Sequence, residues 1–374
     1  MSISTRLANL LLLGASSLAA LALGEAALRS AWPQPLDAAY VWPDGTLRHL
    51  PSFRYTYTRR DFSNVVSYNA LGLRGRELTA SPAPGTLRLA VLGDSFVEGK
   101  QVGDDEVFTA RLESLATAAG RRLEVVNAGV GGYGTGDELL LWERAIAPMG
   151  PSVVLVGFFA NDVRNNVDRA LFDCRDGRLL QVQEPPRPRV RWLYEAQKSL
   201  VARSHLAYLV KNAARGAAPD APERVAGAWL VEDEEVFALD PSPRIQRGWT
   251  LTLALLDELR RRVEAAGARF AVVAVPNRYQ VDDAWWSQHV RRLGLDPAAF
   301  DRRTPQRRLG EWAARTGSEL IDLLDAFREA NRANRFYYVV DAHWNAAGHR
   351  LAAETLLREL AARGLLTASA PAPP

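Results

Sequence analysis

Four short blocks of the sequence carry residue types that together could perform acyl transfer. A serine stands in the first block, Gly93-Asp94-Ser95, and the second block, residues 127–132, is rich in glycine. The third block ends in Asn161-Asp162, and the fourth combines Asp341 with His343. Acyl transfer by a serine needs such a set, because the hydroxyl requires a base and the tetrahedral oxyanion requires fixed hydrogen-bond donors.

The roles of the first and last blocks follow from this chemistry. We expect Ser95 to be the nucleophile and His343 to be the base that takes its proton. Asp341 would hold the other ring nitrogen and stabilise the imidazolium that forms. In an extended chain, residues two apart point the same way about 6.6 Å apart, so this carboxylate and ring can meet. The simpler alternative for Ser95 is the N-cap of a helix, a position that serine favours.

The blocks follow the apolar runs of an alternating pattern of strands and helices. The runs predict buried strands at 87–92, 123–126, 153–159, 270–275 and 319–323. Periodic stretches predict helices at 108–119, 137–146, about 192–214, 250–266, 346–362 and one ending at 311–316. This alternation indicates an α/β fold, a three-layer α/β/α sandwich around a flavodoxin-like, doubly wound parallel sheet of about five strands. In such folds ligands bind beyond the carboxyl ends of the strands.

The blocks GDS, NAGVGG, AND and DAH resemble, in order and placement, the four blocks of the SGNH, or GDSL, hydrolases. The resemblance covers about residues 87–362 and implies the SGNH hydrolase fold, a serine esterase activity and no cofactor. It also implies an oxyanion hole formed by the backbone N–H groups of Ser95 and Gly132 and the side-chain amide of Asn161. The Asp-x-His spacing, followed by Trp344-Asn345, resembles exported proteins that handle acyl groups on bacterial polysaccharides.

Several features near the blocks have other interpretations. The glycines at 129–134 lack the Gly-x-Gly-x-x-Gly spacing of a phosphate-binding loop, and Val97 replaces the last glycine of an α/β-hydrolase elbow. A metal held by His349 and the fourth block matches no standard spacing, so we expect His349 to be structural and no metal to bind. Trp285-Trp286 either line a glycan-binding surface or pack in the core. The other histidines follow no ligand pattern and are expected at the surface or in packing: His49, His205 and His289.

The first 31 residues predict a signal anchor or a signal peptide. The apolar run over 7–28 would form a helix of about 33 Å, enough to cross a hydrocarbon core of about 30 Å. Glu25 would then lie near the outer interface, where a carboxylate costs less than at the centre. Cleavage is the alternative, because Ala20-Leu21-Ala22 fits the small-x-small pattern. We favour a membrane anchor with the catalytic domain extracytoplasmic (periplasmic), over secretion after cleavage.

The rest of the chain is expected to have three parts. These are an extended lead-in (32–86), a hydrolase-like domain (87–364) with an insertion at about 164–245 that shapes the substrate cleft, and a disordered tail (365–374). A content of 48% hydrophobic and 24% charged residues excludes disorder over most of the 374 residues. One cysteine excludes a disulfide scaffold, and a net charge of +3 is too weak for nucleic-acid binding.

The expected function is that of an extracytoplasmic serine esterase acting through an acyl-Ser95 intermediate. Its substrate would be an acylated small molecule or glycan, with acetyl on a carbohydrate suggested by the resemblance. A polysaccharide O-acetyltransferase is the main alternative, because a sugar hydroxyl could resolve the same intermediate in place of water. A lipase or thioesterase is a further option. A non-catalytic glycan-binding or assembly protein is the alternative from a different class.

Overall fold

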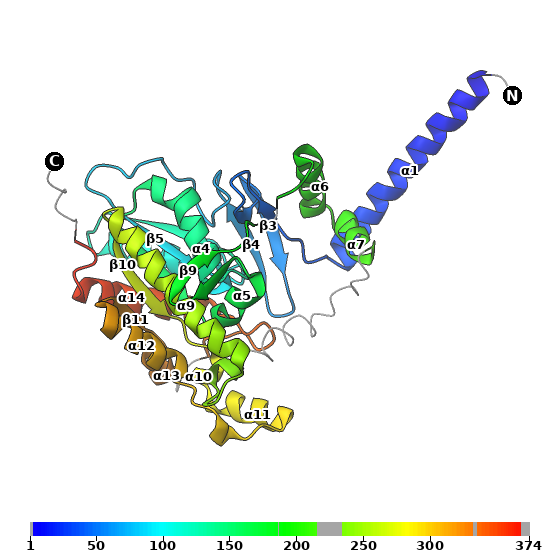
Figure 1. Cartoon of the computed structure of the whole chain (residues 1–374). Coiled ribbons are helices and arrows are strands. Elements are labelled where there is room, and N and C mark those ends of the chain that lie inside the picture. Colours follow the sequence, from blue (N-terminus) through cyan, green and yellow to red (C-terminus); the bar gives the residue numbers. More distant parts are fainter. Residues whose placement is uncertain (1–2, 186, 215–233, 332–334, 368–374) are drawn as a thin grey trace.

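A parallel sheet of five strands forms the centre of the computed structural model, which describes residues 3–185, 187–214, 234–331 and 335–367. Across the sheet the strands are β11 (Glu319–Asp322), β10 (Arg269–Ala274), β7 (Val153–Phe158), β5 (Leu87–Gly93) and β6 (Leu123–Gly129) (Figure 1). Every residue of β5, β6 and β7 is buried, as expected of parallel strands covered on both faces. The predicted α/β class and flavodoxin-like strand order are confirmed.

The register aligns the carboxyl ends of three neighbouring strands, β6, β5 and β7. Gly93, the last residue of β5, pairs with Gly129 of β6 and with Gly157 of β7. The first strand of the sheet lies between the second and the third, so the strand order reverses here, and such switch points are where α/β sheets bind ligands. The segments that follow these strands carry the first three blocks and therefore start side by side.

Helices cover both faces of the sheet and complete three layers (Figure 1). One face packs against α4 (Thr135–Leu141), α5 (Asp162–Arg169), α9 (Pro243–Ala265) and α12 (Thr304–Thr316). The other face packs against α3 (Phe108–Ala118), α13 (Leu324–Ala330) and α14 (Ala346–Ala362). Each interface has its own apolar cluster, so the sheet separates two hydrophobic cores.

The helix α9 begins earlier than its apolar pattern predicts. The pattern predicts a start at 250, whereas α9 begins at Pro243. The Ser242 side chain accepts a hydrogen bond from the Ile245 N–H, and proline fits the first turn because it needs no N–H partner there. This Ser-Pro signal sets the true start.

The lead-in and part of the insertion form an accessory layer rather than an extended strand. The lead-in folds into two antiparallel hairpins, β1 (Ala39–Val41) with β2 (Leu47–His49) and β3 (Phe53–Thr58) with β4 (Ser63–Tyr68). The single helix expected at 192–214 is two, α6 (Arg191–Arg203) and α7 (His205–Ala214), because the backbone of Ser204 is extended. Side chains of both helices complete a third apolar cluster with the lead-in.

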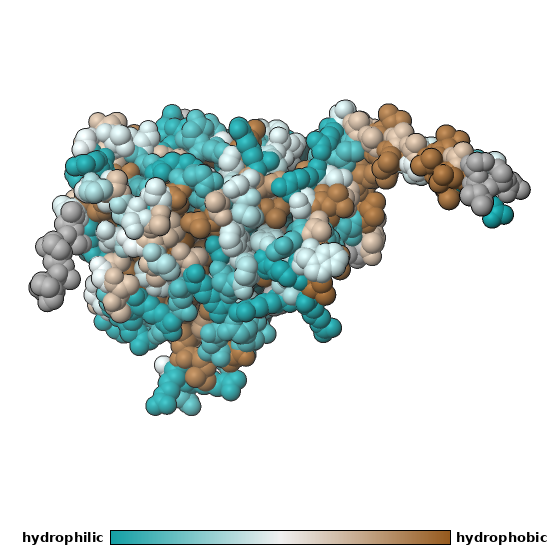
Figure 2. Space-filling view, turned by 90° about the horizontal axis from the view of Figure 1, so that it is seen from above, coloured by the Kyte–Doolittle hydropathy of each residue, from teal (hydrophilic) through white to brown (hydrophobic). Residues whose placement is uncertain are grey.

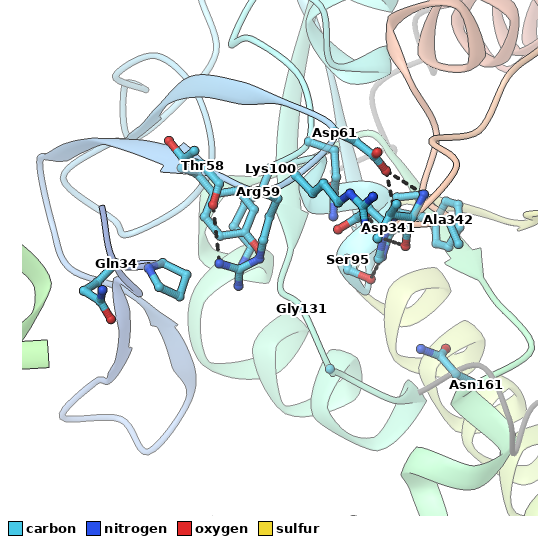
Figure 3. Close-up of a pocket in the computed structure, with 18 of the residues that line it drawn as sticks. Gln34, Thr58, Arg59, Asp61, Ser95, Lys100, Gly131, Asn161, Asp341 and Ala342 are labelled. Atoms are coloured by element: carbon cyan, nitrogen blue, oxygen red, sulfur yellow. Dashed lines mark hydrogen bonds and ion pairs between the residues drawn. The ribbon is translucent and has the colours of Figure 1, made fainter. Parts of the chain in front are cut away.

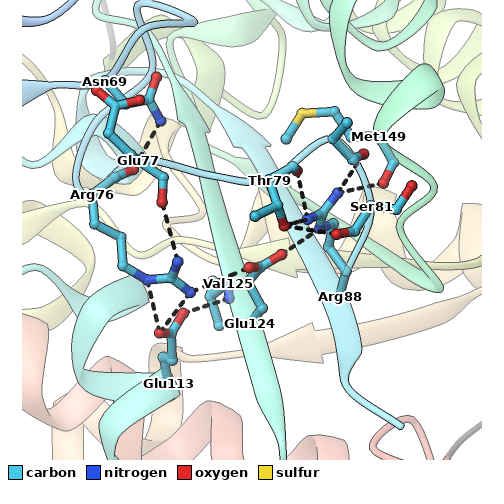
Figure 4. Close-up of polar contacts among 11 residues, drawn as sticks. Asn69, Arg76, Glu77, Thr79, Ser81, Arg88, Glu113, Glu124, Val125 and Met149 are labelled. Atoms are coloured by element: carbon cyan, nitrogen blue, oxygen red, sulfur yellow. Dashed lines mark hydrogen bonds and ion pairs between the residues drawn. The ribbon is translucent and has the colours of Figure 1, made fainter. Parts of the chain in front are cut away.

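A buried arginine ties the end of the lead-in to the sheet (Figure 4). Arg88 of β5 is fully buried and forms an ion pair with Glu124 of β6. Its guanidinium also donates to the backbone carbonyls of Thr79 at 2.8 Å and Met149 at 2.6 Å. A charged group is tolerated inside the sheet because its donors find partners there.

The N-terminal helix α1 (Ile3–Ala31) projects away from the body of the molecule (Figure 1). Its segment Thr5–Ala31 is long and apolar enough to cross a membrane, and the apolar window within it is 0% buried. The foot of α1 is held by Glu25, whose carboxylate accepts hydrogen bonds from the Ser204 hydroxyl and from the backbone N–H groups of His205 and Leu206. Glu25 therefore caps α7, a contact absent from the sequence prediction.

The remaining elements are short and connect those described above. They are α2 (Ser95–Glu98), η1 (Trp142–Ile146), η2 (Ala147–Met149), β8 (Phe172–Arg175), β9 (Arg178–Gln181), η3 (Glu234–Phe237), α10 (Arg278–Val281), α11 (Asp283–Leu293) and η4 (Pro297–Ala299). At the C-terminus, Leu365 and Leu366 are buried, so these two residues belong to the core and not to the tail predicted at 365–374. Residues 368–374 of that predicted tail lie outside the described residues.

Candidate active site

The serine of the first block begins a short helix directly after the strand β5. Asp94, not Ser95, is the N-cap of α2, because its carboxylate accepts the Phe96 N–H at 2.9 Å. The N-cap interpretation of Ser95 is therefore wrong, and its hydroxyl is available for another partner. That partner is His343, whose Nε2 lies 2.8 Å from the Ser95 Oγ.

The histidine and aspartate of the fourth block form the second contact of a triad. The Nδ1 of His343 lies 2.6 Å from the Oδ1 of Asp341. The expected meeting of these side chains is confirmed, but not through an extended backbone. Ala342 between them has a φ of 68°, in the left-handed region, so a tight turn brings the carboxylate to the ring.

The charges of His343 and Asp341 shift the pKa values of the two groups in opposite directions. Burial by itself lowers the pKa of His343, but the carboxylate of Asp341 outweighs burial and raises this pKa above its ordinary value. Burial raises the pKa of Asp341, while the imidazolium charge and hydrogen bond of His343 hold it below its usual range. The pair therefore favours a charged imidazolium, the state that forms when a base removes a proton from a serine.

The three predicted oxyanion donors line one cavity together with the triad. Ser95, Gly132 and Asn161 all face this space, and Gly132 has a φ of 80°, a conformation that glycine adopts without strain. The Asn161 Nδ2 donates to the Asp94 carboxylate at 3.1 Å. An amide nitrogen carries two hydrogens, so Asp94 can orient Asn161 while the second hydrogen serves the cavity.

A buried glutamate that the sequence pattern did not indicate holds the glycine loop against α2, the helix that begins with Ser95. Glu98, the last residue of α2, is fully buried and accepts the Gly131 N–H at 2.7 Å and the Tyr68 hydroxyl at 2.6 Å. Its Oε1 lies 3.0 Å from His49 Nε2 and 3.5 Å from Lys100 Nζ. Burial alone would raise the pKa of Glu98, but the charges of Lys100 and His49 hold it well below its usual range.

The lead-in also reaches the active site, which the sequence pattern did not indicate. Asp61, in the turn between β3 and β4, accepts the backbone N–H groups of Val340 at 2.7 Å and Asp341 at 2.9 Å (Figure 3). The cavity around the triad has a volume of about 540 Å³ and is lined by the lead-in, by α7 and by the loops after the strands. The accessory layer thus forms one wall of the site and also holds the loop that carries the acid.

The other residues singled out in the sequence have structural contacts. Asn345 caps α14, since its side chain accepts the N–H groups of Ala347 and Gly348. His349 accepts the Phe108 N–H through Nδ1, and burial lowers its pKa to about 3, which fits the structural role expected for it.

Burial and hydrogen bonds decide between a surface position and core packing for the two tryptophans and the remaining histidines. Trp286 is buried, and neither it nor Trp285 is among the described residues that line the cavity, which favours packing over a glycan platform there. His49 and His289 are buried rather than at the surface. His205 accepts the Gln34 N–H through Nδ1 at 2.7 Å.

Two family models match the chain. Residues 91–297 match the model of the GDSL-like lipase/acylhydrolase family, a stretch that includes Ser95, Gly132 and Asn161. Residues 226–372 match the model described as SGNH hydrolase-like domain, acetyltransferase AlgX, a stretch that includes Asp341 and His343. A search of curated proteins finds no match.

Several solved structures are similar to the chain. One is an acetylxylan esterase from Geobacillus stearothermophilus, at 16% identity and a TM-score of 0.41, covering 74% of this chain and 95% of that chain. Another is a lipase/acylhydrolase from Enterococcus faecalis, at 14% identity and a TM-score of 0.42, covering 74% and 97%. A third, an α/β hydrolase from the metagenome of Lake Arreo, Spain, has 17% identity and a TM-score of 0.40, covering 75% and 97%.

Proposed function

This chain belongs to the GDSL-like lipase/acylhydrolase family, and we propose that it removes ester-linked acetyl groups from a carbohydrate outside the cytoplasm. The observation that carries the proposal is the continuous chain of contacts from the Ser95 hydroxyl through both ring nitrogens of His343 to Asp341. This geometry allows a proton to leave the serine as its oxygen attacks a carbonyl carbon.

The proposed reaction has two halves. His343 takes the Ser95 proton as the oxygen bonds to the acyl carbon, and the oxyanion is held by Gly132, Asn161 and the Ser95 N–H. When the tetrahedral intermediate collapses, His343 gives its proton to the departing sugar oxygen, which leaves an acyl-serine. Water then gives a proton to His343 and attacks the acyl group, and the second collapse releases the acid and restores the serine.

The acetyl and carbohydrate parts of the proposal rest on two further supports. The fourth block lies within the match to a domain described as an acetyltransferase. The cavity lining is rich in amide side chains, which can donate to and accept from sugar hydroxyls. These are Gln34, Gln101, Asn165, Asn212 and Asn277.

An O-acetyltransferase using the same triad is the second candidate, and the acetyltransferase match over 226–372 favours it specifically. In that reaction the acyl-serine is formed in the same way. A sugar hydroxyl then replaces water, gives its proton to His343 and takes the acyl group. The two candidates therefore differ only in the acceptor that enters the cavity.

The extracytoplasmic location is proposed from α1. Its leucines from Leu7 to Leu23 are exposed, and the part of the body that the structure describes does not cover them. A bilayer removes such a surface from water. We propose that α1 remains attached as an anchor, because Glu25 near its foot caps α7 of the accessory layer.

The first test asks whether Ser95 is an activated nucleophile. We expect the full chain in detergent micelles to react with a fluorophosphonate probe and Ser95→Ala not to react, while Ser81→Ala, at an exposed serine of the lead-in, reacts like the wild type. Labelling that persists in Ser95→Ala would remove this serine from the mechanism. Absence of labelling in the folded wild type would favour a non-catalytic glycan-binding or assembly protein.

A second test separates the esterase from the transferase. An acetylated oligosaccharide is supplied with and without a non-acetylated acceptor, and both free acetate and acetylated acceptor are measured. Acetate release that the acceptor does not change supports the esterase. Transfer to the acceptor at the expense of acetate release supports the acetyltransferase, and Ser95→Ala should abolish either product.

A further inference from the structure

The helix α6 carries an apolar stripe that the described residues leave uncovered. Trp192, Leu193 and Leu200 are 71%, 54% and 60% exposed. Together with the exposed Ala196, they fall within one sector of the helix. Positions one, four and eight residues after Trp192 lie within about 100° of it around the helix axis. The opposite side of α6 is buried through Val201 and Ala202 in the core of the accessory layer.

The stripe lies close to the helix proposed to cross the membrane. Arg29 of α1 donates to the backbone carbonyl of Arg203, the last residue of α6, at 2.7 Å, and α7 packs against the foot of α1. In Figure 1, α6 and α1 project from the same side of the body. Figure 2 shows hydrophobic residues along α1 and further hydrophobic residues on the body near its base.

The charge around the stripe is strongly basic. Between 187 and 211 the chain contains six lysines and arginines but only one acidic residue, Glu195. A second cavity, of about 850 Å³, lies at the foot of α1, and Arg29, Arg54 and Arg203 line it. Basic groups beside an exposed apolar stripe match the anionic headgroups and acyl chains at the surface of a bilayer.

We propose that α6 docks on the same membrane that α1 crosses, with its apolar stripe in the headgroup region of anionic phospholipids. A helix of 13 residues, about 20 Å long, is too short to cross a bilayer but suits a position in the interface. The occupant is lipid because the end of α6, the helix that carries the stripe, contacts the foot of α1 through Arg203 and Arg29. The inference rests on the proposed membrane location of α1 and is independent of the reaction at Ser95.

This second contact would fix the active site relative to the membrane. A single spanning helix allows the attached body to rotate and tilt, whereas two contacts hold it in one orientation. Tyr208, Leu209 and Asn212 of α7 line the cavity that contains Ser95. The wall of that cavity would therefore be held close to the lipid surface.

The test measures the depth of single labelled positions in vesicles that contain the full chain. In a Cys174→Ser background, one cysteine is placed at Leu200 in the stripe, at Leu12 in α1 or at Leu239 as the control, and carries an NBD fluorophore. The three leucines are matched in exposure, at 60%, 70% and 63%. Lipids with a doxyl group near the headgroup quench only fluorophores that touch lipid.

We expect strong quenching at position 200, none at position 239, and more quenching at 200 when phosphatidylglycerol is added to phosphatidylcholine vesicles. Quenching at 200 no greater than at 239, while position 12 is quenched by lipids with a deeper doxyl group, would overturn the docking of α6 but not the anchor. A blue shift at 200 without quenching would assign the stripe to a second copy of the chain instead. A label at 12 that no doxyl lipid quenches would overturn the membrane location itself.

Discussion

Two fully buried carboxylates, those of Asp94 and Glu98, support the serine, histidine and aspartate that we propose to be catalytic. Asp94 caps the helix that begins with Ser95 and also holds the Asn161 amide. Glu98 holds the glycine loop through the Gly131 N–H, and the next residue, Gly132, lines the cavity. The reactive geometry therefore depends on two carboxylates beside the triad.

The pH dependence of the reaction should report the pKa of His343. Because the carboxylate of Asp341 raises this pKa above the ordinary value of about 6.5, kcat/KM should rise with pH and reach half its maximum above pH 6.5. The value of kcat/KM rises with pH because only the neutral imidazole can accept the Ser95 proton. A profile of kcat/KM from pH 5 to 9 tests this, and a flat profile would remove His343 as the base.

Glu98 is predicted to act as a positioning residue for the oxyanion hole. Glu98→Ala frees the Gly131 N–H. We expect kcat to fall by up to the roughly 10²–10³-fold loss typical of a missing oxyanion donor, while KM changes less. Glu98→Gln keeps an acceptor oxygen and should restore part of kcat. The matched control is Glu113→Ala, which removes a glutamate that accepts the Val125 N–H away from the cavity. Equal losses in both alanine variants, or a loss confined to KM, would contradict the prediction.

At the scale of elements, the accessory layer does more than cover the end of the sheet. The hairpin of β3 and β4 is tied to the loop that carries the acid, because Asp61 accepts two backbone N–H groups from it. The ring of Phe62 also lies 5.0 Å from the ring of Tyr338 in the same loop. The position of Asp341 relative to His343 therefore depends on Asp61, which lies 280 residues earlier in the chain.

Removing this tie should weaken catalysis without removing a catalytic group. Asp61→Ala leaves the N–H groups of Val340 and Asp341 without their acceptor, and we expect kcat/KM to fall by roughly the tenfold that 1.4 kcal/mol represents. Asp61→Asn keeps one acceptor oxygen and should retain most activity. If the acid loop is displaced, the midpoint of the pH profile should move down in Asp61→Ala, because His343 loses part of the field of Asp341. An unchanged midpoint together with unchanged kcat/KM would show that the tie is dispensable.

At the scale of the whole molecule, several carboxyl groups are buried together beneath the site. Glu138 of α4 and Asp162 of α5 are fully buried, and Asp94 lies near them. Burial raises the pKa of Glu138 well above its usual range, and the charges of Asp94 and Asp137 add to this shift. The folded protein thus retains a proton on Glu138 at a pH where the unfolded chain has released it.

This buried proton predicts how stability changes with pH. A carboxyl group whose pKa is raised on folding contributes to stability at low pH. As the pH rises above the pKa that Glu138 has in the unfolded chain, the free energy of unfolding falls by at most about 1.4 kcal/mol per pH unit. Glu138→Gln mimics the protonated group and should lose this dependence. Urea unfolding in detergent micelles should therefore show Glu138→Gln gaining stability over the wild type between pH 5 and pH 8. A difference between the two proteins that stays constant with pH would contradict the prediction.

The sequence alone was enough to predict the sheet and the three side chains that meet as a triad. Buried parallel strands have continuous apolar runs, and catalytic groups in such folds follow the strands, so local patterns carry both kinds of information. Ser95, Asp341 and His343 were assigned in this way, and the structure brings them into contact. The helix 346–362 was also predicted with its observed bounds, because Asn345 supplies a recognisable cap.

Only the tertiary structure decided which groups support the triad. Glu98, Asp61 and Arg88 look in the sequence like ordinary charged residues, because an isolated carboxylate or guanidinium carries no sign of the backbone group it will meet. The left-handed turn at Ala342 was likewise invisible, since alanine adopts that conformation only where the surroundings impose it. Contacts between residues far apart in the chain follow from packing, and local propensity does not contain them.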